Sequence, residues 1–180
     1  MRMWICTDYK IDWTAVAAGI ALWIWAHDTL RRRKERAASR RLLAQIMTKP
    51  FMEAEIEIAR FRESLVATFG EQASARQLVD TPVEGREQIH SKALRVALDL
   101  PSQFIDKADL FDSISASLVA KAFSQIGYLH RLWKLQVDSN EDVDAQGRLR
   151  LAAAAFEQVG VTEKAIKEAL DAMLRVGKVS

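Results

Sequence analysis

The sequence predicts an all-α protein, in which one N-terminal transmembrane helix precedes a cytoplasmic bundle of about five helices. Three observations lead to this fold class. Fourteen consecutive residues near the N-terminus, 13–26, carry no charge. Beyond residue 50, apolar residues recur at the spacing of helices, and no segment alternates as a half-buried strand does. Pro50, Gly70, Pro101 and Gly160 fall between the apolar segments, where helices commonly end.

The first element is a predicted transmembrane helix over residues 11–30. Twenty residues of helix span roughly 30 Å, the thickness of the hydrocarbon core of a bilayer. The interior of this segment consists of Ala, Val, Ile, Leu and Trp, with a single Gly19. Trp13 lies near one end, and Trp23 and Trp25 lie near the other, where aromatic rings favour the headgroup region. We therefore expect these residues to anchor the chain in a membrane.

A basic juxtamembrane helix, residues 31–49, follows directly. It contains a cluster of seven cations opposed by the single carboxylate of Glu35; the cations are Arg31, Arg32, Arg33, Lys34, Arg36, Arg40 and Arg41. The excess of positive charge predicts that this side of the span is cytoplasmic and that residues 1–10 form a short external tail. We expect the cations to bind anionic lipid headgroups. The layout is shared by many unrelated bacterial inner-membrane proteins, and it identifies no specific family.

Three charged or titratable residues, Asp12, His27 and Asp28, weaken the transmembrane interpretation. They lie at the ends of the span, where a charge costs less than at the bilayer centre. Two alternatives are a helix lying in the plane of the membrane surface and a helix buried in a soluble oligomer. A cleaved signal peptide fits less well, because residues 24–26 do not form a small-x-small cleavage site.

Small residues recur every four positions within the span, in the pairs Thr14 and Ala18, Ala15 and Gly19, and Ala17 and Ala21. This spacing lets two helices approach closely. It therefore predicts a face through which the span associates with a second copy.

The charge of the chain is unevenly distributed, which bears on its partners. Residues 42–180 contain 17 Lys and Arg against 20 Asp and Glu, a net charge of −3. This part has no basic surplus with which to hold a polyanion, so we expect no nucleic-acid partner. The single cysteine excludes an intramolecular disulfide framework.

The cytoplasmic helical domain, residues 50–180, begins after a predicted break at Lys49–Pro50. The first helix runs to Phe69, with Gly70 as its cap. Its inward residues are Phe51, Ala54, Ile58, Phe61 and Leu65, and a wider face adds Met52, Ile56, Ala59 and Val66. A short helix is possible within 71–79, and residues 80–85 read as a loop.

Four further helices are predicted, over residues 86–98, 107–137, 143–159 and 163–176. Ile89, Ala93, Val96 and Ala97 should face inward on the first of these. The second should bury Phe111, Ile114, Leu118, Ala122, Ile126, Leu129 and Trp133. Gly160 should end the third, Thr162 should cap the fourth, and Gly177 should stop it.

Three groups of residues have side chains of the types that bind metals or catalyse reactions. Asp138, Asn140, Asp142 and Asp144 match odd positions of a calcium-binding loop, but Val143 and Leu149 replace its required Gly and Glu, which favours a solvated turn. Glu53 and Glu57 share a helix face, where nearby cations favour ion pairs over a metal site. The histidines His27, His90 and His130 lack metal-ligand spacing. We expect no cofactor, no metal and no catalytic residue.

The sequence is compatible with three functions. The first is a non-enzymatic, single-pass membrane protein whose cytoplasmic domain binds a protein partner or a second copy. The second is an effector that permeabilises the membrane by oligomerising through its span. The third is a membrane-tethered enzyme that uses glutamates 53–63 with a metal.

Overall fold

The computed structural model describes residues 13–71, 73–100, 107–138 and 144–178, and these parts of the chain are helical with no strand. The α-helices that they form are α1 (Trp13–Phe69), α2 (Ala75–Val79), α3 (Val83–Ala93), α5 (Ser113–Asp138) and α6 (Ala145–Gly177), with a short 3₁₀ helix at Ala108–Leu110. The all-α fold class is confirmed.

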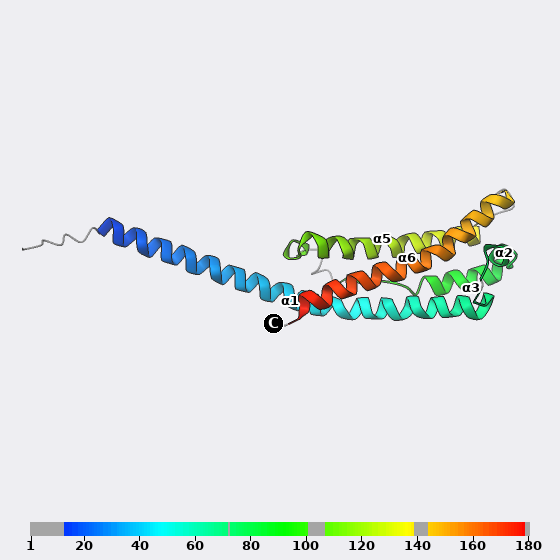
Figure 1. The fold of residues 1–180 in the computed structure, drawn as a ribbon, viewed down its shortest axis with the longest axis horizontal. Coiled ribbons are helices and arrows are strands. Elements are labelled where there is room, and N and C mark those ends of the chain that lie inside the picture. Colours follow the sequence, from blue (N-terminus) through cyan, green and yellow to red (C-terminus); the bar gives the residue numbers. More distant parts are fainter. Residues whose placement is uncertain (1–12, 72, 101–106, 139–143, 179–180) are drawn as a thin grey trace, which may run out of the picture. The chain divides into compact units, whose positions relative to one another are not determined.

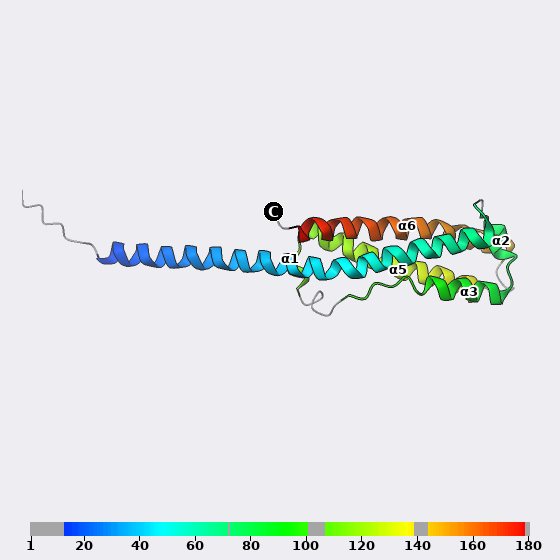
Figure 2. The same cartoon turned by 90° about the horizontal axis from the view of Figure 1, so that it is seen from below.

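The chain divides into two units, residues 1–39 and residues 40–180, and α1 contributes to both. In the second unit, the part of α1 beyond residue 40 runs beside α5 and α6 (Figures 1 and 2). Helix α3 packs on α5, and α2 packs on α6. This unit is therefore a helical bundle with one shared apolar core.

Helix α1 supplies the best-predicted part of the core. Its five residues predicted to face inward are all at most 4% exposed; they are Phe51, Ala54, Ile58, Phe61 and Leu65. The indole of Trp133 on α5 meets the rings of Phe61 and Phe156 edge to face, at centroid distances of 5.3 and 5.9 Å. These aromatic contacts join α1, α5 and α6, as such pairs do in protein cores.

Polar groups are also enclosed between α5 and α6. The amide Nε2 of Gln158 donates to the Gln125 side-chain oxygen at 2.6 Å, and the Thr162 hydroxyl donates to the Gln125 carbonyl oxygen at 3.3 Å. Both Gln158 and Thr162 are buried. Because buried polar groups are costly without partners, these bonds fix which residues of α5 and α6 lie opposite one another.

The helix break predicted at Lys49–Pro50 is wrong, because α1 continues through Pro50. A proline leaves the carbonyl four residues earlier, that of Ile46, without its helical donor. Ile46 is exposed, so water can bond this carbonyl, while Met47 and Phe51 are buried on the opposite side of the helix. Burial on that side thus keeps the helix continuous.

The break predicted at Gly160 is also wrong, because α6 is one helix from Ala145 to Gly177. Thr162 is not a cap but a buried residue of the helix interior. Its neighbours Val159 and Ile166 are buried as well, so packing along this face outweighs the low helix propensity of glycine.

Other helix limits and faces differ from the prediction. Helix α3 begins within the predicted loop and ends at Ala93. Val96 and Ala97 therefore lie after the helix, where Val96 is buried and Ala97 is exposed.

Helix α5 begins at Ser113, where Asp112 caps it. Ile114 is exposed, because the buried face starts at Ser115. On α1 the wider face is incomplete, since Met52, Ile56 and Val66 are exposed.

Two predicted helix ends are confirmed by the structure. Gly70 follows α1 with a φ of +82°, a left-handed conformation that glycine adopts without a steric penalty. Its N–H donates to the Val66 carbonyl oxygen at 2.7 Å. Gly177 is the last residue of α6.

Across the described residues, none of the helices has the combination of length and apolar character that crossing a membrane requires. The transmembrane part of the predicted fold therefore receives no support from the structure.

Candidate functional site

The candidate site residues predicted from the sequence lie mainly on the N-terminal part of α1. From Ala18 to Trp25 the side chains are exposed, including the large apolar residues Ile20, Leu22, Trp23, Ile24 and Trp25. These five side chains are 55–70% exposed, and at 100° per residue they point to all sides of the helix. The side chain of Trp13 lies outside the described residues, and Gly19 is exposed.

Each polar residue at the end of this apolar segment has a partner within the same helix. The ring of His27 stacks on Trp23 at a centroid distance of 5.6 Å. The carboxylate of Asp28 pairs with Arg32 at 2.8 Å, and the hydroxyl of Thr29 donates to the Trp25 carbonyl oxygen at 2.8 Å. These contacts lower the cost of placing polar groups next to an apolar environment.

The first five cations of the basic cluster, Arg31, Arg32, Arg33, Lys34 and Arg36, are all exposed. Arg31 donates to the Glu35 carboxylate at 2.8 Å, and this bond raises the pKa of Arg31. Three of the guanidinium groups, together with Trp25, Asp28 and Thr29, line a surface hollow of about 330 Å³. An indole ring and several cations therefore surround one hollow where the apolar segment meets the basic one.

The last two cations of the cluster, Arg40 and Arg41, belong to the bundle. They line a pocket of about 490 Å³ with Arg175 and Lys178 from the C-terminal end of α6. Asp112 contributes a carboxylate, but this accepts from the backbone N–H and hydroxyl of Ser115, which lowers the pKa of Asp112. Four cations thus face one carboxylate in this basic pocket.

Sequence reasoning did not connect Arg175 and Lys178 with this site. Their positions lie at the other end of the chain from Arg40, and single cations in a last helical turn are common. Only the packing of α6 along α1, which brings the Gly177 carbonyl oxygen within 3.2 Å of Gln45 Nε2, places them beside Arg40.

Two of the glutamates proposed as an alternative chemical site are ion-paired. Glu53 pairs with Lys49 at 3.7 Å, and Glu57 pairs with Arg60 on the next turn. Among the residues that the structure describes, no group of three His, Cys, Asp or Glu side chains is arranged to hold a metal ion. Most of the acidic turn lies outside the described residues; Asp144 caps α6 by accepting from the Gly147 N–H at 2.8 Å.

Two of the scattered histidines come close enough to influence each other. His90 on α3 and His130 on α5 repel electrostatically when both are protonated, and burial is the main cause that lowers the pKa of His90. The Nε2 atom of His130 lies 2.8 Å from the Val96 carbonyl oxygen. This bond holds the segment that follows α3, which is a structural role.

Comparison of the chain with protein-family models, with curated proteins and with solved structures finds no match to any of them. The function is therefore inferred from the residues and their geometry.

Proposed function

We propose that this chain is a non-enzymatic protein held at the inner membrane by residues 11–30, with its helical bundle as an interaction module on the cytoplasmic side. The observation that carries the proposal is the exposure of large apolar side chains on every side of α1 between Ile20 and Trp25. Such a helix is buried in a protein core or in a bilayer, because full burial of each large apolar side chain is worth about 1.5–3 kcal/mol.

The distribution of these side chains favours a span over an in-plane helix. An in-plane helix needs one apolar and one polar face, and the segment from Ala18 to Ala26 has no charged face. The uncharged run 13–26 is about 21 Å of helix, shorter than a hydrocarbon core of about 30 Å. The polar residues at both ends of the segment must therefore also lie within the span. Local thinning of the bilayer would reduce the length that the helix has to cross, and the long side chain of Arg32 would extend toward the headgroups.

The basic cluster supports the orientation and the lipid partner. The five exposed cations from Arg31 to Arg36 follow the apolar segment directly, as cytoplasmic flanks of spans commonly do. Their attraction to anionic headgroups is worth about 1 kcal/mol per residue near the surface.

An interaction role for the bundle is supported by apolar side chains that its core leaves uncovered. Leu42, Ile46, Met52 and Ile56 are exposed on one side of α1 within the bundle. Such uncovered groups on a helix suit a protein partner or a second copy.

Membrane fractionation tests the proposal. The full chain with a C-terminal reporter should resist extraction by alkaline carbonate, and the reporter should be protected from protease in intact cells. Leu22→Arg combined with Ile24→Arg should release the protein into the carbonate supernatant. A control with Ile114→Arg and Phe123→Arg changes two equally exposed apolar residues of the bundle and should stay in the membrane. Release of the unaltered chain by carbonate would refute the anchor.

The permeabilising alternative depends on self-association through Gly19. A Cβ atom at this position would meet nothing within 4 Å, so the small residue is available to a neighbouring helix. Toxicity on overexpression that Gly19→Leu abolishes would favour this alternative, whereas harmless overexpression would argue against it.

Elemental analysis of the purified protein tests the third alternative, a metal-dependent enzyme.

A further inference from the structure

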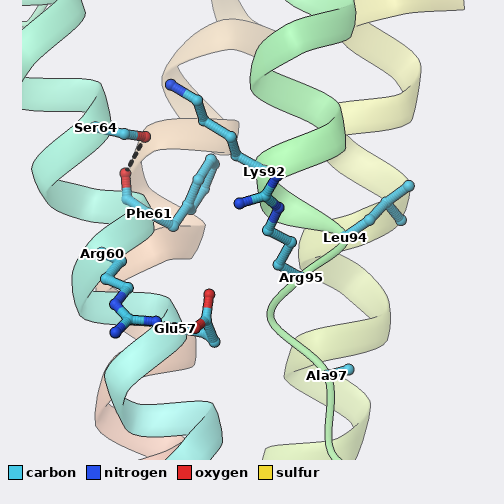
Figure 3. A pocket seen from close by; sticks show the side chains of 8 residues that line it. All are labelled: Glu57, Arg60, Phe61, Ser64, Lys92, Leu94, Arg95 and Ala97. Carbon is cyan, nitrogen blue, oxygen red and sulfur yellow. Dashed lines mark hydrogen bonds and ion pairs between the residues drawn. The ribbon is translucent and has the colours of Figure 1, made fainter.

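A second basic pocket lies in the bundle, between α1 on one side and the last turn of α3 with the segment that follows it on the other (Figure 3). Its volume is about 620 Å³, which is within the range of pockets that bind small molecules. Helix α1 contributes Glu57, Arg60, Phe61 and Ser64, and the opposite wall contributes Lys92 and Arg95. The sequence gives no sign of this pocket, because its cations come from separate segments.

The charges in this pocket are unbalanced. Glu57 is already paired with Arg60. Within the described parts of the chain, neither Lys92 nor Arg95 makes an ion pair or a side-chain hydrogen bond. Lys92 extends toward α1, and the guanidinium of Arg95 lies beside Lys92 (Figure 3). Three cations and one carboxylate leave a net charge of about +2, which matches the two negative charges of a phosphate monoester near neutral pH.

The walls that present these cations are held in place by the fold. The Arg95 N–H donates to the Lys92 carbonyl oxygen at 3.1 Å. The next residue, Val96, is fully buried, and its carbonyl oxygen accepts from His130 Nε2. On the α1 side, Phe61 is fixed by its contact with Trp133. A pocket whose backbone is fixed in advance loses less entropy when a ligand binds.

The chemistry of the other lining residues argues for binding rather than catalysis. The Ser64 hydroxyl donates to the Phe61 carbonyl oxygen at 2.8 Å, so it is not hydrogen-bonded to a base. A bare phosphate ion would leave most of the 620 Å³ unfilled. The remaining volume lies beside the ring of Phe61, which suits an apolar or aromatic group, while the Leu94 side chain points away from this ring (Figure 3).

We propose that this pocket binds a small organic phosphate monoester, with Lys92 and Arg95 at the phosphate and the organic part toward Phe61, while Arg60 stays paired with Glu57. Arginine suits this role because its planar donors match phosphate oxygens in pairs. The proposal goes beyond membrane attachment and does not depend on it.

Calorimetric titration of the full chain in a nonionic detergent tests the proposal, with phenyl phosphate and inorganic phosphate as probes. Phenyl phosphate should bind, and it should bind several-fold more tightly than inorganic phosphate. Lys92→Ala and Arg95→Ala should each weaken binding about tenfold, as expected for the loss of one charged hydrogen bond. The control Lys164→Ala with Lys167→Ala removes two exposed cations of α6 and should bind as the unaltered chain does.

Three results would overturn the proposal. The first is no binding of phenyl phosphate to a chain whose circular dichroism shows folded helices. The second is equal loss of binding in the pocket variants and in the control variant. The third is displacement of phenyl phosphate by short-chain phosphatidylglycerol, which would assign the pocket to a lipid phosphate instead of a soluble ligand.

Discussion

The Nε2 atom of His130 on α5 lies 2.8 Å from the carbonyl oxygen of Val96, in the segment that follows α3. Because a carbonyl oxygen only accepts, Nε2 carries the proton in this bond. Val96 is fully buried, so the bond and the side chain together fix the segment against the bundle. One histidine thus holds the segment around Val96, and it also positions the neighbouring Arg95 at the phosphate pocket.

We predict that His130→Ala destabilises the bundle by about 1–3 kcal/mol, because the Val96 carbonyl oxygen loses its donor. His130→Gln keeps an amide donor and should cost less. The free energy of unfolding from urea titrations measures both changes. Equal stability of His130→Ala and the unaltered chain would show that solvent replaces the histidine.

Stability should also depend on pH through His90. Burial lowers the pKa of His90 below its ordinary value of 6.5; positive charge on His130 and Lys134 adds to this effect, and Asp138 opposes it. The unfolded chain then binds a proton more readily than the folded chain, so stability falls as the pH drops through 6.5 toward the folded pKa. Between about pH 7.5 and about pH 5.5, the unaltered chain should therefore lose more stability than His90→Gln does. The same loss in both proteins would place the pH dependence at other groups.

The sequence predicted the helical class and much of the core because both follow from local periodicity. The stripe from Phe51 to Leu65 has this character, since its residues face one direction on any helix. Local periodicity does not predict whether a helix continues through Pro50 and Gly160. Both residues disfavour a helix locally, and only the burial of neighbours such as Met47 and Thr162 against other helices outweighs that preference.

The candidate sites also divide into those made by neighbours in the sequence and those made by the packing of distant segments. The cations from Arg31 to Arg36 are adjacent in the chain, so a sequence pattern finds them. The basic pocket of Arg40 needs Arg175, and the phosphate pocket joins Arg60 with Arg95. These groupings depend on how α6 and the segment after α3 pack along the bundle, which no spacing in the sequence specifies.

A substitution at Gly160 tests whether packing outweighs the low helix propensity of glycine in α6. It lies inside α6, and an added Cβ atom would meet nothing within 4 Å. Gly160→Ala should therefore stabilise the bundle by about 0.5–1 kcal/mol, through reduced freedom of the unfolded chain. Gly70→Ala is the matched counterpart, and it should destabilise because its φ of +82° strains any side chain. Thermal unfolding followed by circular dichroism measures both, and a destabilising Gly160→Ala would contradict the structure of α6.

The basic pocket of the bundle should retain anionic lipid. This pocket places four cations, Arg40 among them, against the single carboxylate of Asp112, so an anionic headgroup would balance its charge. Arg40→Ala combined with Arg175→Ala removes two of the four cations, which should weaken binding of short-chain phosphatidylglycerol at least about tenfold, as expected for the loss of one charged hydrogen bond. A titration of the full chain in nonionic detergent measures this change. The control Lys164→Ala with Lys167→Ala, which lies outside the pocket, should leave the affinity unchanged. Equal affinities in all three proteins would mean that the exposed cations from Arg31 to Arg36 hold the lipid alone.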